Sequence, residues 1–197
     1  GSALEFASAD LKNDPEIVKL AIQQNGLALI YASKELQNNP EIVKLALKQN
    51  GMLLGLISVE FQTREIIKIA VEQDGRALKF VYGDLQDDPE IVEIAVQSYG
   101  QALRFTSDSE LQKNRNIVKA AVQQDGRALR YLVDELQNDR EIVMYAVQQV
   151  GIALEHASPQ LKNDREIVKI AVQQDPAAIE FASEELKKDS EIIGLLK

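Results

Sequence analysis

The sequence has no cysteine, no tryptophan and a single histidine among its 197 residues. The lack of cysteine excludes disulfide bonds, thiolate zinc sites and thiol catalysis. One histidine leaves few ways to build an acid–base pair or a metal site, and the nucleotide-binding, zinc-protease and EF-hand motifs are all missing. We therefore expect a protein that is not an enzyme and that has no catalytic, cofactor-binding or metal-binding residues.

The sequence is also short of positive charge and of long apolar runs. It has 22 basic against 31 acidic residues and a formal net charge of −9, which disfavours nonspecific binding to nucleic acid or to anionic membranes. The sequence contains no run of about 18 apolar residues, which is the length needed to span a bilayer. With 45% hydrophobic residues the chain is expected to be folded and soluble. That is compatible with the cytoplasm but does not identify a compartment.

What the sequence does contain is a repeat. Glycine recurs at positions 26, 51, 75, 100, 126 and 151, and Pro176 takes the seventh place, so the chain divides into segments of 24 to 26 residues. A period in this range is typical of stacked-repeat solenoids. The sequence therefore predicts an all-α fold, an α-solenoid of about eight two-helix repeats that form a single array over residues 3–197. The predicted repeats are residues 3–26, 27–51, 52–75, 76–100, 101–126, 127–151, 152–176 and 177–197, and residues 1–2 resemble a cloning remnant.

Each repeat shows the signals of two helices. In the second repeat, the apolar residues within 28–32 fit a short amphipathic helix, and Ser33 can cap a short turn after it. The second helix opens at Asn39-Pro40-Glu41, with an Asn cap, a proline at the first position and a glutamate facing the helix dipole. The glycine after this helix is expected to be its left-handed C-terminal cap.

A glutamine recurs near the end of the second helix. We expect it to tie neighbouring repeats together through a side-chain hydrogen bond, with a row of glutamines that binds a ligand as the alternative. The recurring residues are Gln24, Gln49, Gln73, Gln124, Gln149 and Gln174.

The repeated strings ASKELQNNPEIVKLALKQNG and ASPQLKNDREIVKIAVQQD give the chain a resemblance to a known family. They are similar to the short tandem helical repeats classified as domain of unknown function 4116, and the resemblance covers essentially residues 3–197. It implies a helical repeat array, but the family has no established activity that could be assigned to particular residues. The chain departs from the pattern at Thr63-Arg64, where the loop is one residue short, and at Ser107-Asp108-Ser109, where it is one residue long.

Two positions in the first helix of each repeat vary while the framework stays constant. They lie three residues apart and are expected to share one face, which we call the variable face. In chain order the pairs are Leu27 and Ile30, Met52 and Gly55, Arg76 and Lys79, Gln101 and Arg104, Arg127 and Arg130, Ile152 and Glu155, and Ala177 and Glu180.

Five cations of the variable face are the first candidate for a functional site: Arg76, Lys79, Arg104, Arg127 and Arg130. One interpretation is a solvated surface on which these side chains pair with nearby carboxylates. The other is a site for an acidic peptide or a phosphate-bearing ligand, which suits the planar, forked guanidinium group of arginine.

The second candidate is the apolar patch of Leu27, Ile30 and Met52. Either the adjacent turn covers these side chains, or they form an exposed surface for a partner or for self-association. The only histidine, His156, occupies a position that elsewhere holds Phe or Tyr, so a structural role is expected for it. The array also begins and ends without a polar capping repeat. We therefore expect a piece of a longer protein, whose open ends are a second possible route to self-association.

These observations favour a binding scaffold that recognises a protein or a peptide, with an acidic one as a candidate, through the variable face. The alternative is a structural spacer or an oligomerisation segment of a larger protein. A nucleic-acid-binding array is less favoured, because the variable pair is not basic or polar in every repeat and no stacking aromatic residue is expected beside it. No membrane partner is expected.

Overall fold

The computed structural model describes residues 2–196. The chain forms two compact units, residues 1–98 and residues 99–197. Every regular element among the described residues is a helix. Gly1 of the predicted remnant and Lys197 at the end of the last predicted repeat lie outside the described residues.

The first predicted helix of each repeat is a 3-10 helix of five or six residues. It begins at the recurring glycine, not after it, and so the repeat boundary moves by one residue. These helices are η1 (Ser2–Phe6), η2 (Gly26–Tyr31), η3 (Gly51–Leu56), η5 (Gly75–Phe80), η7 (Gly100–Phe105), η8 (Gly126–Tyr131), η9 (Gly151–His156) and η11 (Pro176–Phe181).

A short helical turn follows each of them, as the sequence predicts. The turns are α1 (Ala9–Lys12), α3 (Lys34–Gln37), η4 (Val59–Phe61), η6 (Gly83–Leu85), α7 (Ser109–Lys113), α9 (Asp134–Gln137), η10 (Leu161–Asn163) and η12 (Leu186–Lys188). Ser33 and Ser158 cap their turns through Oγ, which accepts from Leu36 N and Leu161 N. Ser58, at the position that corresponds to Ser33, makes no such bond, and Asp108 is the cap of α7.

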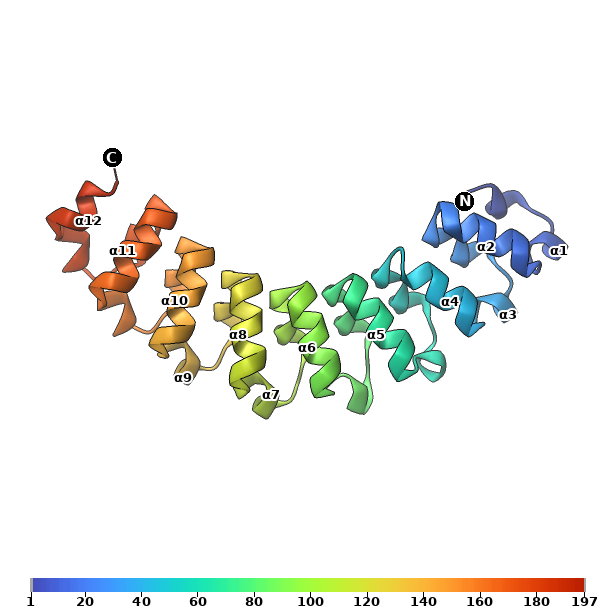
Figure 1. Cartoon of the computed structure of the whole chain (residues 1–197), viewed down its shortest axis with the longest axis horizontal. Coiled ribbons are helices and arrows are strands. Elements are labelled where there is room, and N and C mark those ends of the chain that lie inside the picture. Colours follow the sequence, from blue (N-terminus) through green and yellow to red (C-terminus); the bar gives the residue numbers. More distant parts are fainter. Residues whose placement is uncertain (1, 197) are drawn as a thin grey trace. The chain divides into compact units, whose positions relative to one another are not determined.

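The second predicted helix is the long one. These helices are α2 (Pro15–Gln24), α4 (Pro40–Leu47), α5 (Arg64–Gln73) and α6 (Pro89–Ser98) in the first unit, and α8 (Arg115–Gln124), α10 (Arg140–Gln149), α11 (Arg165–Gln174) and α12 (Ser190–Gly194) in the second. Within each unit, each long helix packs beside the next one in sequence (Figure 1). The all-α tandem-repeat fold predicted from the sequence is confirmed.

The core is made from one face of each long helix and one or two apolar residues of each of the 3-10 helices that begin the repeats. In α10 the inner face is Ile142, Val143, Ala146 and Val147, all fully buried. The predicted Asp and Asn caps hold: Asp139 Oδ1 accepts from Glu141 N at 3.0 Å and from Ile142 N at 3.1 Å. The caps and the apolar spacing together explain why these short helices form, since burial against neighbours stabilises them.

The recurring glycines do not adopt the left-handed conformation, so that prediction is wrong. Among the described residues only Gly83 has a positive φ, of 67°. Space is the reason for glycine at the other positions: a Cβ on Gly126 would lie 2.2 Å from the carbonyl oxygen of Ala146 in the next long helix. Glycine is therefore required for close approach between neighbouring repeats.

Three of the recurring glutamines, Gln49, Gln124 and Gln174, tie neighbouring repeats together, as expected, at the junction of a long helix and the next 3-10 helix. Gln49 Oε1 accepts from Gly26 N at 2.9 Å, and Gln49 Nε2 donates to Gln23 O at 2.9 Å. Gln174 makes the same pair of bonds with Gly151 N and Gln149 O. Because both ends of the amide are used inside the framework, these glutamines are structural.

Gln174→Ala should lower the free energy of unfolding by about 1–3 kcal/mol, the usual cost of leaving a buried donor such as Gly151 N without its acceptor. The exposed neighbour Gln173 offers the matched control, and Gln173→Ala should change stability little. Urea unfolding of both variants is the measurement. Equal stability of the two variants would show that the glutamine does not tie the repeats together.

Ion pairs link successive long helices on their outer side. Arg115 reaches Asp139 and Glu141 of the next long helix, at 2.6 Å each. Arg165 makes the same pair of contacts with Asp189 and Glu191, and Arg64 with Asp88 and Glu90. Basic residues at the start of one helix therefore neutralise the acidic first turn of the next.

The Glu90 carboxylate should titrate near pH 2. Its pKa is lowered to about 2, first by the hydrogen bond from Arg64 and then by the one from Lys68. Since this folded-state pKa lies below the ordinary value of about 4.3, the pairs stabilise the fold above that pH, and the effect is lost as the pH falls toward 2. An NMR titration of the Glu90 carboxyl carbon checks this, and Arg64→Gln should move the midpoint toward the ordinary value. An unchanged midpoint in the variant would contradict the assignment to Arg64.

Candidate partner-binding surface

The 3-10 helices place the variable side chains on the outside of each unit. In η8, Ala128 and Leu129 are fully buried, whereas Arg127 and Arg130 on either side of them are exposed. A 3-10 helix has three residues per turn, so residues three apart lie directly above one another. This geometry explains why the two variable positions of a repeat share one face.

The same arrangement holds in the other 3-10 helices. Nearly all residues of the variable face are exposed, and only Met52 and Gln101 are half-buried. The cations divide between the units: Arg76 and Lys79 belong to the first, and Arg104, Arg127 and Arg130 belong to the second. We call the last three residues the cationic patch.

Arg127 is held in place by Asp125, which is also the N-cap of η8. The Arg127 Nε and Nη2 atoms each lie 3.0 Å from a carboxylate oxygen of Asp125. Asp125 accepts in addition from Arg127 N at 3.0 Å and from Gln101 Nε2 at 2.6 Å. Burial opposes the charged form of Asp125, but the hydrogen bonds from Arg127 and Gln101 outweigh it and lower its pKa. The carboxylate therefore stays ionised and orients the guanidinium group.

Arg104 and Arg130 lie on aromatic rings. The Arg104 guanidinium lies 4.7 Å from the ring centre of Phe105 and 5.6 Å from that of Tyr131, and Nη1 donates to the Tyr131 hydroxyl at 3.1 Å. Arg130 lies 5.3 Å from the same Tyr131 ring. Within residues 99–196 neither arginine forms an ion pair with a carboxylate. Both charges are positioned by rings and remain available to an external anion.

A pocket of about 270 Å³ opens beside the cationic patch. It is lined by Gln101, Arg127, Arg130, Ile152, Ala153, Glu155 and His156. His156 is half-buried, in agreement with its position, which elsewhere holds Phe or Tyr. Burial lowers the pKa of His156, against the attraction of Glu155, so that the imidazole is neutral at neutral pH. The positive charge of the pocket therefore comes from its two arginines, and Glu155 opposes it on one side.

The two cations of the first unit, Arg76 and Lys79, have similar surroundings. Arg76 is paired with Asp74, the N-cap of η5, at 2.6 Å from Nη2 to Oδ2. This pairing is the main reason why the pKa of Asp74 is lowered. Lys79 lies 4.7 Å from the ring centre of Phe80. The predicted pairing of cations with carboxylates is therefore found for Arg76 and Arg127, but not for Arg104.

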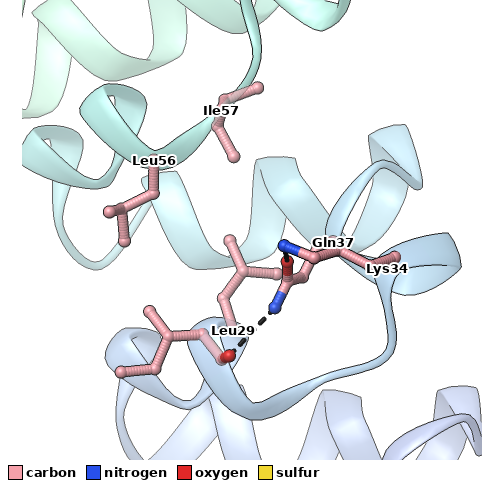
Figure 2. A pocket seen from close by; sticks show the side chains of 6 residues that line it. Leu29, Lys34, Gln37, Leu56 and Ile57 are labelled. Atoms are coloured by element: carbon pink, nitrogen blue, oxygen red, sulfur yellow. Dashed lines mark hydrogen bonds between the residues drawn. The ribbon is translucent and has the colours of Figure 1, made fainter.

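The apolar patch is open to solvent at two of its three residues. Leu27 and Ile30 are 46% and 43% exposed, and Met52 is half-buried. The sequence pattern did not single out Leu56, which is 59% exposed and lines a pocket of about 210 Å³ with Ile30. Figure 2 shows Leu56 and Ile57 on one side of this pocket and Leu29, Lys34 and Gln37 on the other.

The structure corrects one expectation about aromatic residues. Rings do lie beside the variable face, because three rings at the ends of 3-10 helices, Phe80, Phe105 and Tyr131, lie against its cations. The sequence held the signal for this, since Phe or Tyr follows Lys79, Arg104 and Arg130 directly. The capping role of Asp74 and Asp125 was also missed, although an Asp-Gly pair marks both positions.

Two features that would point to other kinds of site are absent from the described residues. Within residues 2–196, no group of three or more His, Asp or Glu side chains is placed to hold a metal ion. No helix in that range has both the length and the apolar character needed to cross a membrane.

Comparison with known proteins identifies the repeat. Six stretches, some of which overlap, match the sequence model of the family described as Domain of unknown function (DUF4116): residues 1–37, 16–62, 63–112, 114–162, 150–187 and 164–194. No curated protein matches the chain, and no solved structure does either. The matches span most of the sequence, which confirms the resemblance seen in the repeated motif.

Proposed function

We propose that this chain, which belongs to the DUF4116 family, is a non-enzymatic scaffold that binds an acidic protein or peptide through the variable face of its 3-10 helices. The observation that carries the proposal is the environment of Arg104 and Arg130. Both guanidinium groups are exposed and held on aromatic rings, and neither is paired with a carboxylate within residues 99–196. Preorganised, unpaired guanidinium groups suit the carboxylates of an acidic partner.

The contrast with the long helices supports this assignment. There, the basic residues Arg115, Arg140 and Arg165 are each paired with two acidic residues of the next repeat. Those arginines hold the array together, whereas Arg104 and Arg130 make no ion pair with the framework of residues 99–196. A chain with a net charge of −9 that leaves two arginines unpaired on one face has a surface suited to an anion.

A nucleic acid would also supply anions, and the rings beside Arg104 are the feature that favours it. Here, however, those rings are half-buried and already lie against cations, so their faces are not open platforms for bases. An acidic peptide would need only the positive charges of the arginines and no open ring faces. We therefore favour the peptide and treat a nucleic acid as an outcome of the test.

The test is a fluorescence anisotropy titration of the chain against three labelled probes: a peptide of alternating Glu and Ser, a neutral peptide of Asn and Ser, and a single-stranded DNA oligonucleotide. The Glu peptide should bind at low ionic strength and weaken as salt is added, because exposed charges are screened. The neutral peptide should not bind. Absence of binding by the Glu peptide at low salt would refute the proposal, and tighter binding of the oligonucleotide would replace it with a nucleic-acid role.

A further inference from the structure

An aromatic column runs along the ends of the 3-10 helices in each unit, with one gap. The residues that end these helices are Phe6, Tyr31, Leu56, Phe80, Phe105, Tyr131, His156 and Phe181. Only Leu56 lacks a ring. Every other repeat has a ring at this position. The absence of a ring at Leu56 therefore removes a side-chain contact between the second and third repeats.

Two steps of the column show what a ring does at this position. The Phe80 ring packs on Gly55 of the preceding 3-10 helix, where an added Cβ would lie 2.8 Å from Phe80 Cε1. The Tyr131 ring likewise lies against Arg104 of its preceding helix. In these two steps the ring of one repeat therefore lies against the second variable residue of the repeat before it.

At the second and third repeats this ring is missing. Ile30 therefore has no ring from the next repeat against it and is 43% exposed, and Leu56 beside it is 59% exposed. The pocket of about 210 Å³ in Figure 2 lies between them. Its walls are the aliphatic side chains of Leu29, Ile30, Leu56 and Ile57, and its rim carries Lys34 and Gln37. The pocket therefore lies between Ile30 and the position where the third repeat lacks a ring.

We propose that this pocket receives an aromatic side chain of the acidic partner, with a neighbouring carboxylate of that partner on Lys34. The inference rests on the proposed function and names the side chain that gives the partner its specificity. A cavity of about 150 Å³ with aliphatic walls is large enough for a benzene ring, so the volume here suffices. A ring from outside would restore the contact that the other repeats make internally.

Lys34 supplies the charge complementarity. Its Nζ donates to Gln37 Oε1 at 3.1 Å, and Gln37 Nε2 in turn donates to the backbone oxygens of Ile30 and Ala32 at 2.9 and 3.0 Å. The amide is therefore fixed by the backbone of the pocket wall, and it holds the ammonium group at the rim. Within residues 2–98 Lys34 makes no ion pair, so its charge is free for a carboxylate.

The experiment uses small probes that carry the two proposed features separately. Methyl-labelled protein is titrated with 3-phenylpropionate, which has a ring and a carboxylate, and with propionate, which has only the carboxylate. Phenylethylamine, which has the ring with the opposite charge, is the third probe. The methyl signals of Ile30, Leu56 and Ile57 are followed by NMR. Two variants are compared with the wild-type chain: Leu56→Phe, which returns the missing ring, and Lys34→Gln, which removes the charge.

We expect 3-phenylpropionate to shift these methyl signals and the other two probes to shift them far less. Leu56→Phe should weaken binding roughly tenfold, because the added ring fills the space. Lys34→Gln should weaken it roughly threefold, the scale of one exposed ion pair. The thermal unfolding of each variant shows whether it is folded.

Three outcomes would overturn the proposal: no shift with 3-phenylpropionate, an equal response to propionate, or unchanged binding by folded Leu56→Phe. Shifts of the same methyl groups on dilution without any probe would assign the pocket to a second copy of the chain instead. Because the pocket belongs to residues 1–98 and the cationic patch to residues 99–197, failure here leaves binding of the Glu peptide intact, and the two proposals fail separately.

Discussion

Gly126→Ala should lower the free energy of unfolding by about 3 kcal/mol, the upper end of the range for overpacking a close contact. The added Cβ would lie 2.2 Å from Ala146 O and 3.0 Å from Ala146 C. Both atoms belong to the backbone of α10, so no side chain can rotate away, and the two repeats must move apart. The usual gain of about 0.4–1 kcal/mol from replacing glycine by alanine is much smaller than this cost.

Gly194→Ala is the matched control in the same unit. A Cβ at Gly194 meets nothing within 4 Å, and this glycine does not have a positive φ. Its replacement should leave stability unchanged or raise it slightly. Chemical denaturation of both variants with the wild-type chain gives the comparison. If both glycines tolerate alanine equally, close approach is not the reason for the recurring glycine.

Reversing the cationic patch with Arg104→Glu, Arg127→Glu and Arg130→Glu together should weaken binding of the Glu peptide by ten- to a hundredfold. Each exposed ion pair contributes on the order of 0.5–1 kcal/mol, and tenfold in affinity corresponds to about 1.4 kcal/mol. Reversal also adds repulsion to the loss of attraction. The effect should shrink with added salt, because all three side chains are exposed.

The control for this triple variant carries the same change in net charge at other sites: Lys48→Glu, Lys113→Glu and Lys188→Glu. These lysines are exposed and lie outside the variable face. The control should retain most of the binding, since only the general charge of the chain has changed. Anisotropy titrations of both variants decide the matter: a similar loss in both would mean that net charge, and not the cationic patch, attracts the peptide.

The fold could be predicted from the sequence because several independent local signals agree. Caps such as Asp139, prolines at first helical positions and the apolar spacing of each long helix all recur with one period. The 3-10 character of the first helix was not predictable in this way. The close approach of Gly126 to Ala146 was not predictable either, because it is a contact between repeats.

The candidate site was predictable in part. Variation against a constant framework identified Arg104 and Arg130, and the structure places both on the surface. Sequence spacing could not show that Tyr131, from the next repeat, reaches Arg104. Nor could it show that Asp125 serves both as the cap of η8 and as the partner of Arg127. The pocket at Leu56 was missed because it results from a ring that is absent.

The most direct test of the central claim, that the variable face binds the partner, is an NMR titration of the arginine Nε–H signals with the Glu peptide. The account predicts that the signals of Arg104 and Arg130 shift most, because these side chains have no carboxylate partner within residues 99–196. Arg115 and Arg165, which are paired between the long helices, should shift little. Shifts concentrated on Arg115 and Arg165, with Arg104 and Arg130 unchanged, would contradict it.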